Sequence, residues 1–272
     1  MGDVAMTVPV VYSLAHQYPD LRISVLSRPF AKAFFSYMPK NVDFIAADLK
    51  NEYKGIKGLN QLYGRLKAKQ PTAIADFHDV LRSKYIRTRF TLCGYKTAHI
   101  NKHKNGKRKL CRQKDKVMEQ QPTSFQNYAE VLSKLGYPVN LSFSSLFANG
   151  GNQLSQLPNI IGEKTDGERW IGIAPFAAHN GKMYPKEKME EVVKVLSTEY
   201  SNLRIFFFGG GKEEKQILNT WAAKYKGCTC ASEVLHGLNE ELVLISHLDT
   251  MISMDSANMH LASLVGTRVV SI

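Results

Sequence analysis

Strand-like and helix-like segments alternate along the whole chain, and this alternation restricts the fold more than any other feature. In the first half, short runs of branched and aromatic residues predict strands at Leu21–Leu26, Val42–Ala46, Ala73–Phe77 and Thr97–Ile100. Amphipathic segments predict helices near Thr7–Tyr18, Asn60–Lys69, Val80–Leu92 and Ser124–Leu135. Such alternation is typical of parallel sheets with helices on both faces.

The second half repeats the pattern. Strands are predicted at Trp170–Ala174, Leu203–Phe208, Met251–Met254 and Arg268–Ile272, and helices at Lys186–Tyr200, Glu213–Tyr225, Asn239–Ser246 and Ser256–Val265. The polar stretch Asn149–Arg169 lies between the halves and is the candidate linker. We therefore expect two α/β domains, 1–150 and 165–272, each doubly wound and Rossmann-like, facing one another across a ligand cleft.

The two ends of the sequence bear on this organisation. No strand precedes Gly2-Asp3, although a doubly wound domain normally begins with one, and the sequence stops within the strand predicted at Arg268–Ile272. We expect a product that is truncated at both ends.

Composition places the chain among ordinary globular proteins. Hydrophobic residues make up 44% of its 272 residues and charged residues 22%. No apolar run approaches the roughly 20 residues of a membrane span, and no secretory signal is visible at the N-terminus. The four cysteines are too scattered for a disulfide framework or a zinc site. These features predict a cytoplasmic protein.

The chain is basic, with a formal net charge of +12, and much of the excess lies between Lys96 and Lys116. This stretch contains seven Lys and two Arg but only one acidic residue, Asp115. Asn105 and Gly106 within it indicate a loop. This stretch is interpreted as a solvated loop, a patch for a phosphorylated acceptor or an anionic membrane surface, or a nucleic-acid patch. Nucleic acid is disfavoured because no aromatic residue is interleaved with the basic ones.

Two segments combine a backbone able to approach a ligand with a charged side chain. In Gly2-Asp3-Val4-Ala5-Met6-Thr7-Val8-Pro9, Asp3 presents a carboxylate before a helix, unless Asp3 or Thr7 is merely its N-cap. After the strand ending at Ala174, a loop of small residues leads to Lys182. Loop amides and an ammonium suit a diphosphate, and a surface lysine in an ordinary turn is the alternative.

Two further segments follow predicted strands of the second half. Gly209-Gly210-Gly211 permits close passage of a ribose or base, with Glu213 able to accept hydroxyl hydrogen bonds; a flexible turn is the alternative. In Met254-Asp255-Ser256-Ala257-Asn258-Met259-His260, a helix begins immediately after a strand, so its first amides lie at the carboxyl edge of the sheet. At this edge, the Asp255 carboxylate could bind sugar hydroxyl groups. Alternatively, Asp255 or Ser256 simply caps the helix, and His260 is a histidine packed in the core.

These four motifs, in this order, resemble glycosyltransferase family 9, the ADP-heptose:lipopolysaccharide heptosyltransferases. The resemblance implies a GT-B architecture, with the acceptor bound by the first domain and ADP-heptose by the second, and transfer that inverts the anomeric centre. It implies that Asp3 is the general base and that Lys182 stabilises the departing ADP. Donor-binding residues are then Ala177, Ala178, Lys182, Gly209, Glu213, Asp255, Ser256, Ala257 and His260.

The same resemblance implies an anionic lipopolysaccharide-core acceptor, assigned to Gly2, Lys102, Lys104 and Arg108, with contact at the cytoplasmic face of the inner membrane and none with nucleic acid. No Asp-x-Asp motif is evident, so no metal is expected, and the ADP-sugar is a substrate rather than a cofactor. The chain departs from the family pattern in three places: Ala177-Ala178 replaces hydroxyl residues, Tyr184 replaces tryptophan, and Ala257 replaces glycine.

Two other functions remain open. The chain could be another GT-B transferase or epimerase that uses a UDP-sugar, which competition between ADP and UDP would reveal. It could also be a non-catalytic remnant that binds polyanions through Lys96–Lys116, in which case Asp3 would be dispensable.

Overall fold

The computed structural model describes residues 1–272 and divides them into two compact units. The N-terminal unit comprises Met6–Phe143, and the C-terminal unit comprises Met1–Ala5 together with Ser144–Ile272. These units differ from the expected domains because residues 1–5 and 144–150 pack with the C-terminal part. None of the helices has the length and apolar character needed to cross a membrane.

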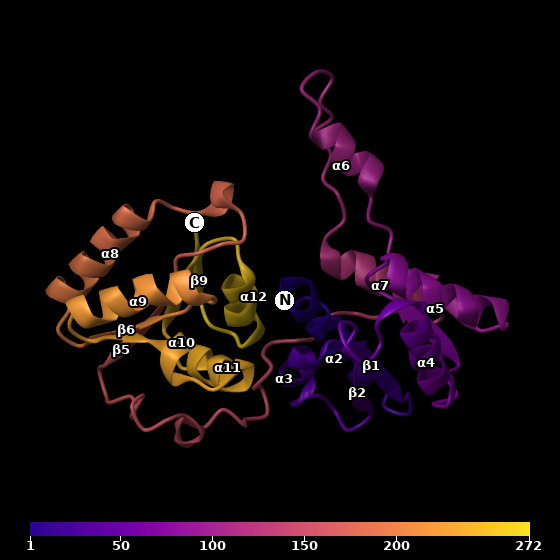
Figure 1. Cartoon of the computed structure of the whole chain (residues 1–272), viewed down its shortest axis with the longest axis horizontal. Helices are drawn as coiled ribbons and strands as arrows, with labels where there is room; N and C mark the ends of the chain where they lie inside the picture. Colours follow the sequence, from indigo (N-terminus) through magenta and orange to yellow (C-terminus); the bar gives the residue numbers. More distant parts are fainter. The chain divides into compact units, whose positions relative to one another are not determined.

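The N-terminal unit contains four strands in two parallel pairs. β1 (Ile23–Ser27) pairs with β2 (Val42–Ala46), and β3 (Ala73–Asp76) pairs with β4 (Lys96–His99). Its helices, labelled in Figure 1, are α2 (Val8–Gln17), α3 (Lys32–Phe35), α4 (Gly55–Lys67), α5 (Leu81–Leu92), α6 (Lys104–Leu110) and α7 (Ser124–Lys134), with a 3-10 turn η1 at Pro29–Ala31.

Two apolar clusters hold these helices on the strands. α2 and α7 contribute Val10, Leu14, Val131 and Leu132 to one cluster, which includes Ala98 of β4. α4 and α5 contribute Leu59, Leu62, Tyr63, Ile86 and Phe90 to the other, against which Ile74 of β3 packs. Because neighbouring residues of a strand point to opposite faces, the helices form two layers with strands between them.

The C-terminal unit is built on one five-stranded parallel sheet, in the order β7-β6-β5-β8-β9. The strands are β5 (Arg169–Ala174), β6 (Leu203–Phe207), β7 (Cys228–Cys230), β8 (Thr250–Ser253) and β9 (Val269–Ser271). The strand order reverses between β5 and β8, so the topological switch point of this doubly wound sheet lies at their carboxyl ends. All eight strands expected from the sequence are present within two residues of their predicted ends.

Helices cover both faces of this sheet. α8 (Lys186–Glu199) and α9 (Lys212–Lys224) pack Met189, Val193, Leu218 and Trp221 around Ile173 and Phe207. Gly172 is next to Ile173 on β5 and therefore lies on the opposite face of the sheet. There it packs against Leu248, just beyond α11 (Leu238–Ser246). The remaining elements are α1 (Gly2–Ala5), α10 (Ala231–Val234), α12 (Ala257–Leu264) and the 3-10 turns η2 (Leu154–Gln156) and η3 (Asn180–Lys182).

Two predictions about connecting segments are wrong. Asn105 and Gly106 lie within α6 rather than in a loop; His103 begins this helix from a left-handed backbone conformation and donates its N–H to Asn101 at 3.0 Å. The candidate linker Asn149–Arg169 is packed onto the C-terminal unit. Ile161 is fully buried, and Lys164 forms an ion pair with Asp249 at 2.8 Å.

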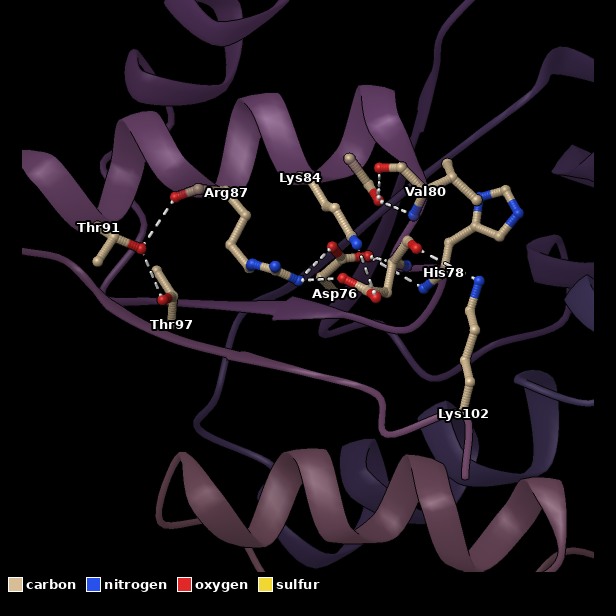
Figure 2. A network of polar contacts seen from close by, with 10 residues as sticks. Asp76, His78, Val80, Lys84, Arg87, Thr91, Thr97 and Lys102 are labelled. Carbon is tan, nitrogen blue, oxygen red and sulfur yellow. Dashed lines mark hydrogen bonds and ion pairs between the residues drawn. The ribbon is translucent and has the colours of Figure 1, made fainter. Parts of the chain in front are cut away.

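A buried carboxylate fixes the turn between β3 and α5 (Figure 2). Asp76 ends β3, and its Oδ1 accepts hydrogen bonds from the backbone N–H groups of His78 and Asp79 at 3.0 and 2.8 Å. Arg87 of α5 donates to both Asp76 and Asp79 at 2.9 Å. Burial by itself raises the pKa of Asp79, but Arg87 and Lys84 outweigh it and hold that pKa below its usual value.

Replacing Asp76 with alanine is expected to lower the free energy of unfolding by about 3 kcal/mol, because two backbone donors and the Arg87 guanidinium lose a buried acceptor. Urea denaturation measures the change, and hydrogen exchange of the His78 and Asp79 amides should accelerate. The matched control is Asp20→Ala at an exposed position. Equal losses in the two variants, or unchanged amide exchange, would contradict this role of Asp76.

Candidate functional site

Two loops meet at the switch point of the C-terminal sheet. The first follows β5 and runs through Lys182 at the end of η3, and the second follows β8 and contains Asp255. The backbone N–H of Tyr184 contacts Met254 Sδ at 3.1 Å, which holds the two loops together. Ligands of open parallel sheets bind at this position, outside the carboxyl ends of the strands.

An ion pair joins the same two loops. Lys182 Nζ donates to Asp255 Oδ2 at 2.5 Å, and both side chains are about half exposed. The hydrogen bond from Lys182 and its positive charge lower the pKa of Asp255. An ammonium has three N–H donors, so Lys182 can contact Asp255 and also donate to an anionic ligand. The pair therefore places one cation and one carboxylate side by side at the edge of the sheet.

The start of α12 adds backbone donors to this edge. Ser256 is the N-cap residue, and its Oγ lies 3.3 Å from the Oγ of the buried Ser253, which donates to the carbonyl of Met254 at 2.8 Å. The first amides of a helix lack partners within the helix and carry a partial positive charge. The helix predicted at Ser256–Val265 is therefore present as Ala257–Leu264, with Ser256 as its N-cap.

His260 of α12 connects this edge to the N-terminus of the chain. A Cβ atom on Gly2 would lie only 2.6 Å from His260 Cδ2, so α1 packs directly against the imidazole ring. The charges of Asp255, Asp3 and Lys182 all act on His260. Burial lowers the pKa of His260 below its usual value of 6.5, and the two carboxylates oppose this effect. Within the C-terminal unit, His260 therefore lies against Gly2 and within electrostatic range of Asp3, Lys182 and Asp255.

The glycine loop after β6 borders the loop after β5. A Cβ atom on Gly209 would lie 2.8 Å from Leu218 Cδ1 and 3.5 Å from Phe176 Cδ2, which leaves little room for any side chain. Gly209 N–H donates to Ser232 Oγ at 3.0 Å, and Gly210 N–H donates to Glu214 Oε2 at 2.7 Å. Glu214 and Ser232 therefore hold this loop.

The sequence predicts a binding role for Glu213 but none for Glu214 or Ser232, which make these hydrogen bonds. Glu213 is exposed in the first turn of α9, one position before Glu214. The first turn of this helix contains two consecutive acidic residues, so the sequence offered Glu214 as a candidate together with Glu213. Ser232 gave none, because it follows the three-residue strand β7, which is too short to recognise from sequence.

The other predicted site residues are divided between the two units. Ala177 packs against the core of the C-terminal unit, and Ala178 is exposed in the loop before Lys182. Lys102, Lys104 and Arg108 belong to the N-terminal unit. Lys102 Nζ donates to the carbonyl of Asp79 at 3.3 Å (Figure 2), whereas Lys104 and Arg108 lie exposed on α6.

The arrangement combines an anion-binding edge with carboxylates that can bind hydroxyl groups or accept a proton. Lys182 and the first amides of α12 provide the positive potential. Asp255 and Asp3 provide the acceptors. No group of three or more His, Cys, Asp or Glu side chains is placed to hold a metal ion.

Comparison with solved structures supports the fold. E. coli heptosyltransferase WaaC with ADP-2-deoxy-2-fluoro heptose matches with a TM-score of 0.72 and 17% identity, covering 100% of this chain and 85% of that chain. E. coli ADP-heptose lps heptosyltransferase II matches with a TM-score of 0.71 and 17% identity, covering 98% and 80%. A putative UDP-N-acetylglucosamine 2-epimerase from Listeria monocytogenes gives 0.59 and 11%, covering 98% and 75%. The expected GT-B fold of two Rossmann-like domains is confirmed.

Sequence comparison gives the family. No curated protein matches the chain. The family model described as glycosyltransferase family 9 (heptosyltransferase) matches residues 61–272, which is most of the chain. The predicted family is therefore confirmed, and the chain is a glycosyltransferase that belongs to glycosyltransferase family 9, the heptosyltransferase family.

Proposed function

We propose that this glycosyltransferase moves a heptose from ADP-heptose to a lipopolysaccharide-core acceptor, with inversion at the anomeric carbon. Membership of the heptosyltransferase family supports the reaction class. Two similar structures are those of E. coli heptosyltransferase WaaC with ADP-2-deoxy-2-fluoro heptose and with ADP. The observation that carries the proposal is that Lys182 pairs with Asp255, while Gly2 packs on His260 and Asp3, Lys182 and Asp255 all act on the charge of that imidazole within one unit.

The donor is proposed to bind at the switch point of the C-terminal sheet. Lys182 and the first amides of α12, from Ser256 and Ala257, face the diphosphate, because these groups are the positive ones at that edge. Asp255 accepts hydrogen bonds from sugar hydroxyls. Ala177, Ala178 and Gly209 lie on the two neighbouring loops and Glu213 lies in the first turn of α9, where a nucleoside would contact them.

Asp3 is proposed to act as the general base. The acceptor hydroxyl oxygen attacks the anomeric carbon from the face opposite ADP, and Asp3 takes the hydroxyl proton. The bond between the anomeric carbon and the β-phosphate oxygen breaks, and its electron pair leaves with ADP. Lys182 stabilises the charge that develops on that oxygen. This displacement needs no metal ion or further cofactor.

His260 is proposed to remain uncharged in this site at neutral pH. Burial holds its pKa below 6.5, so the imidazole adds no positive charge next to Asp3. Lys182 then remains the cation that faces the diphosphate.

The acceptor is proposed to be anionic and to contact Gly2, Lys102, Lys104 and Arg108. Three of these residues are cations of a chain whose formal net charge is +12. A phosphorylated, lipid-linked sugar matches that charge. We further propose that the enzyme works at the cytoplasmic face of the inner membrane.

Replacing Lys182 with alanine is expected to weaken ADP binding by about 10- to 100-fold, the value of a charge-assisted hydrogen bond to phosphate. Calorimetric titration with ADP, UDP and GDP measures the change and should give the tightest binding for ADP. Lys188→Ala, at an exposed position of α8, is the matched control and should bind normally. Preferential binding of UDP would instead support a UDP-sugar transferase or epimerase, and equal ADP binding in both variants would refute the role of Lys182.

Replacing Asp3 with asparagine is expected to reduce kcat by about 10²- to 10⁴-fold, because the amide cannot accept the acceptor proton. ADP binding should remain close to that of the unmodified enzyme, since Asp3 is assigned to the acceptor rather than the diphosphate. Product formation from ADP-heptose and calorimetric ADP titration separate the two effects. Turnover within a few-fold of the unmodified enzyme would exclude Asp3 as the base.

A further inference from the structure

A basic arm, Asn101–Gln121, projects from the N-terminal unit. Figure 1 shows α6 and the loop beyond it extending away from α5 and α7. The base is fixed by a hydrogen bond of 2.9 Å between His103 Nε2 and Asn127 Oδ1 of α7. The two sides of the arm meet where Val117 N–H donates to the carbonyl of Lys109 at 3.4 Å. The arm is therefore a defined hairpin-like projection with an anchored base.

The arm concentrates positive charge that the protein does not neutralise. It contains eight Lys or Arg residues and two acidic residues, so it supplies half of the formal net charge of +12. No ion pair involves any Lys or Arg from Lys104 to Lys116. Elsewhere in the same unit, Lys69, Lys84, Arg87 and Lys134 all pair with carboxylates.

Two large apolar side chains are exposed on the same arm. Val117 is 42% exposed and Met118 is 79% exposed, and no residue of α6 is buried. Lysine and arginine next to exposed apolar residues are typical of segments that lie at a membrane interface. The charged groups meet lipid phosphates, while the apolar side chains enter the boundary between headgroups and acyl chains.

We infer that the basic arm docks the enzyme on the surface of an anionic phospholipid bilayer. Nucleic acid fits less well, because the chain has no Phe, Tyr or Trp between Tyr95 and Phe125 on which bases could stack. The inference rests on the proposed function in one respect, since a bilayer surface would present a lipid-linked acceptor. Docking itself needs only the charge and apolar residues of the arm.

Co-sedimentation with vesicles tests this inference. The protein should bind vesicles of phosphatidylcholine with phosphatidylglycerol and not vesicles of phosphatidylcholine alone. Raising the ionic strength from about 0.1 M to about 1 M should release it, because the Debye length falls from about 10 Å to about 3 Å. Each basic residue near an anionic surface contributes about fivefold in affinity, so Lys107→Gln/Lys109→Gln/Arg112→Gln should bind about 100-fold more weakly.

A matched variant controls for net charge alone. Lys54→Gln/Lys57→Gln/Lys67→Gln removes three exposed charges from or beside α4 and should bind vesicles nearly as well as the unmodified protein. Val117→Ser/Met118→Ser should weaken binding by about tenfold while leaving the salt dependence intact. ADP binding should be unchanged in all three variants, which shows that the chain is folded.

Several results would overturn the inference. These are equal binding to both vesicle types, equal losses in the arm and α4 variants, and release from vesicles by inorganic phosphate alone, which would indicate an isolated phosphate site. An arm variant that loses binding to single-stranded RNA but keeps vesicle binding would also overturn it. Vesicle binding without ADP binding would refute the proposed function and leave the arm's role intact, whereas ADP binding without vesicle binding would do the reverse.

Discussion

The contact between α1 and the His260 imidazole is the constraint on which the candidate site depends. Gly2 has no room for a Cβ atom against that ring, so the first residues of the chain lie directly on α12. The charge of the Asp3 carboxylate therefore affects the pKa of His260, as do the charges of Asp255 and Lys182. One folded unit therefore contains Lys182, Asp255 and the proposed base Asp3.

The strands, and the position of Lys182 and Asp255 after the ends of β5 and β8, could be predicted from sequence because their signals are local. A buried strand followed by a glycine, lysine or acidic residue and then a helix marks the carboxyl edge of a parallel sheet. Lys182 and Asp255 were found in this way, and the structure joins them by an ion pair. The family pattern identified Asp3, but no local pattern indicated that Met1–Ala5 packs with the C-terminal unit, because that depends on a contact between the two ends of the sequence.

Other differences arise where tertiary contacts override local preference. α4 begins at Gly55 rather than at Asn60, because Gly58 packs so closely on the Tyr53 backbone that a Cβ atom would lie 2.3 Å from its carbonyl carbon. Glycine disfavours helix, so sequence alone placed this turn outside it. Asn105 and Gly106 gave the same misleading signal in the basic arm. In both segments, residues with low helix propensity are part of a helix in the folded protein.

The titration of His260 tests the central claim most directly. Proton NMR of the imidazole, assigned with His260→Gln, should give a pKa below 6.5 because the ring is partly buried. Asp3→Asn and Asp255→Asn should each lower that pKa further, since each removes a carboxylate that favours the imidazolium. An unchanged pKa in Asp3→Asn would show that Asp3 does not lie beside His260, and would contradict the site described for this enzyme.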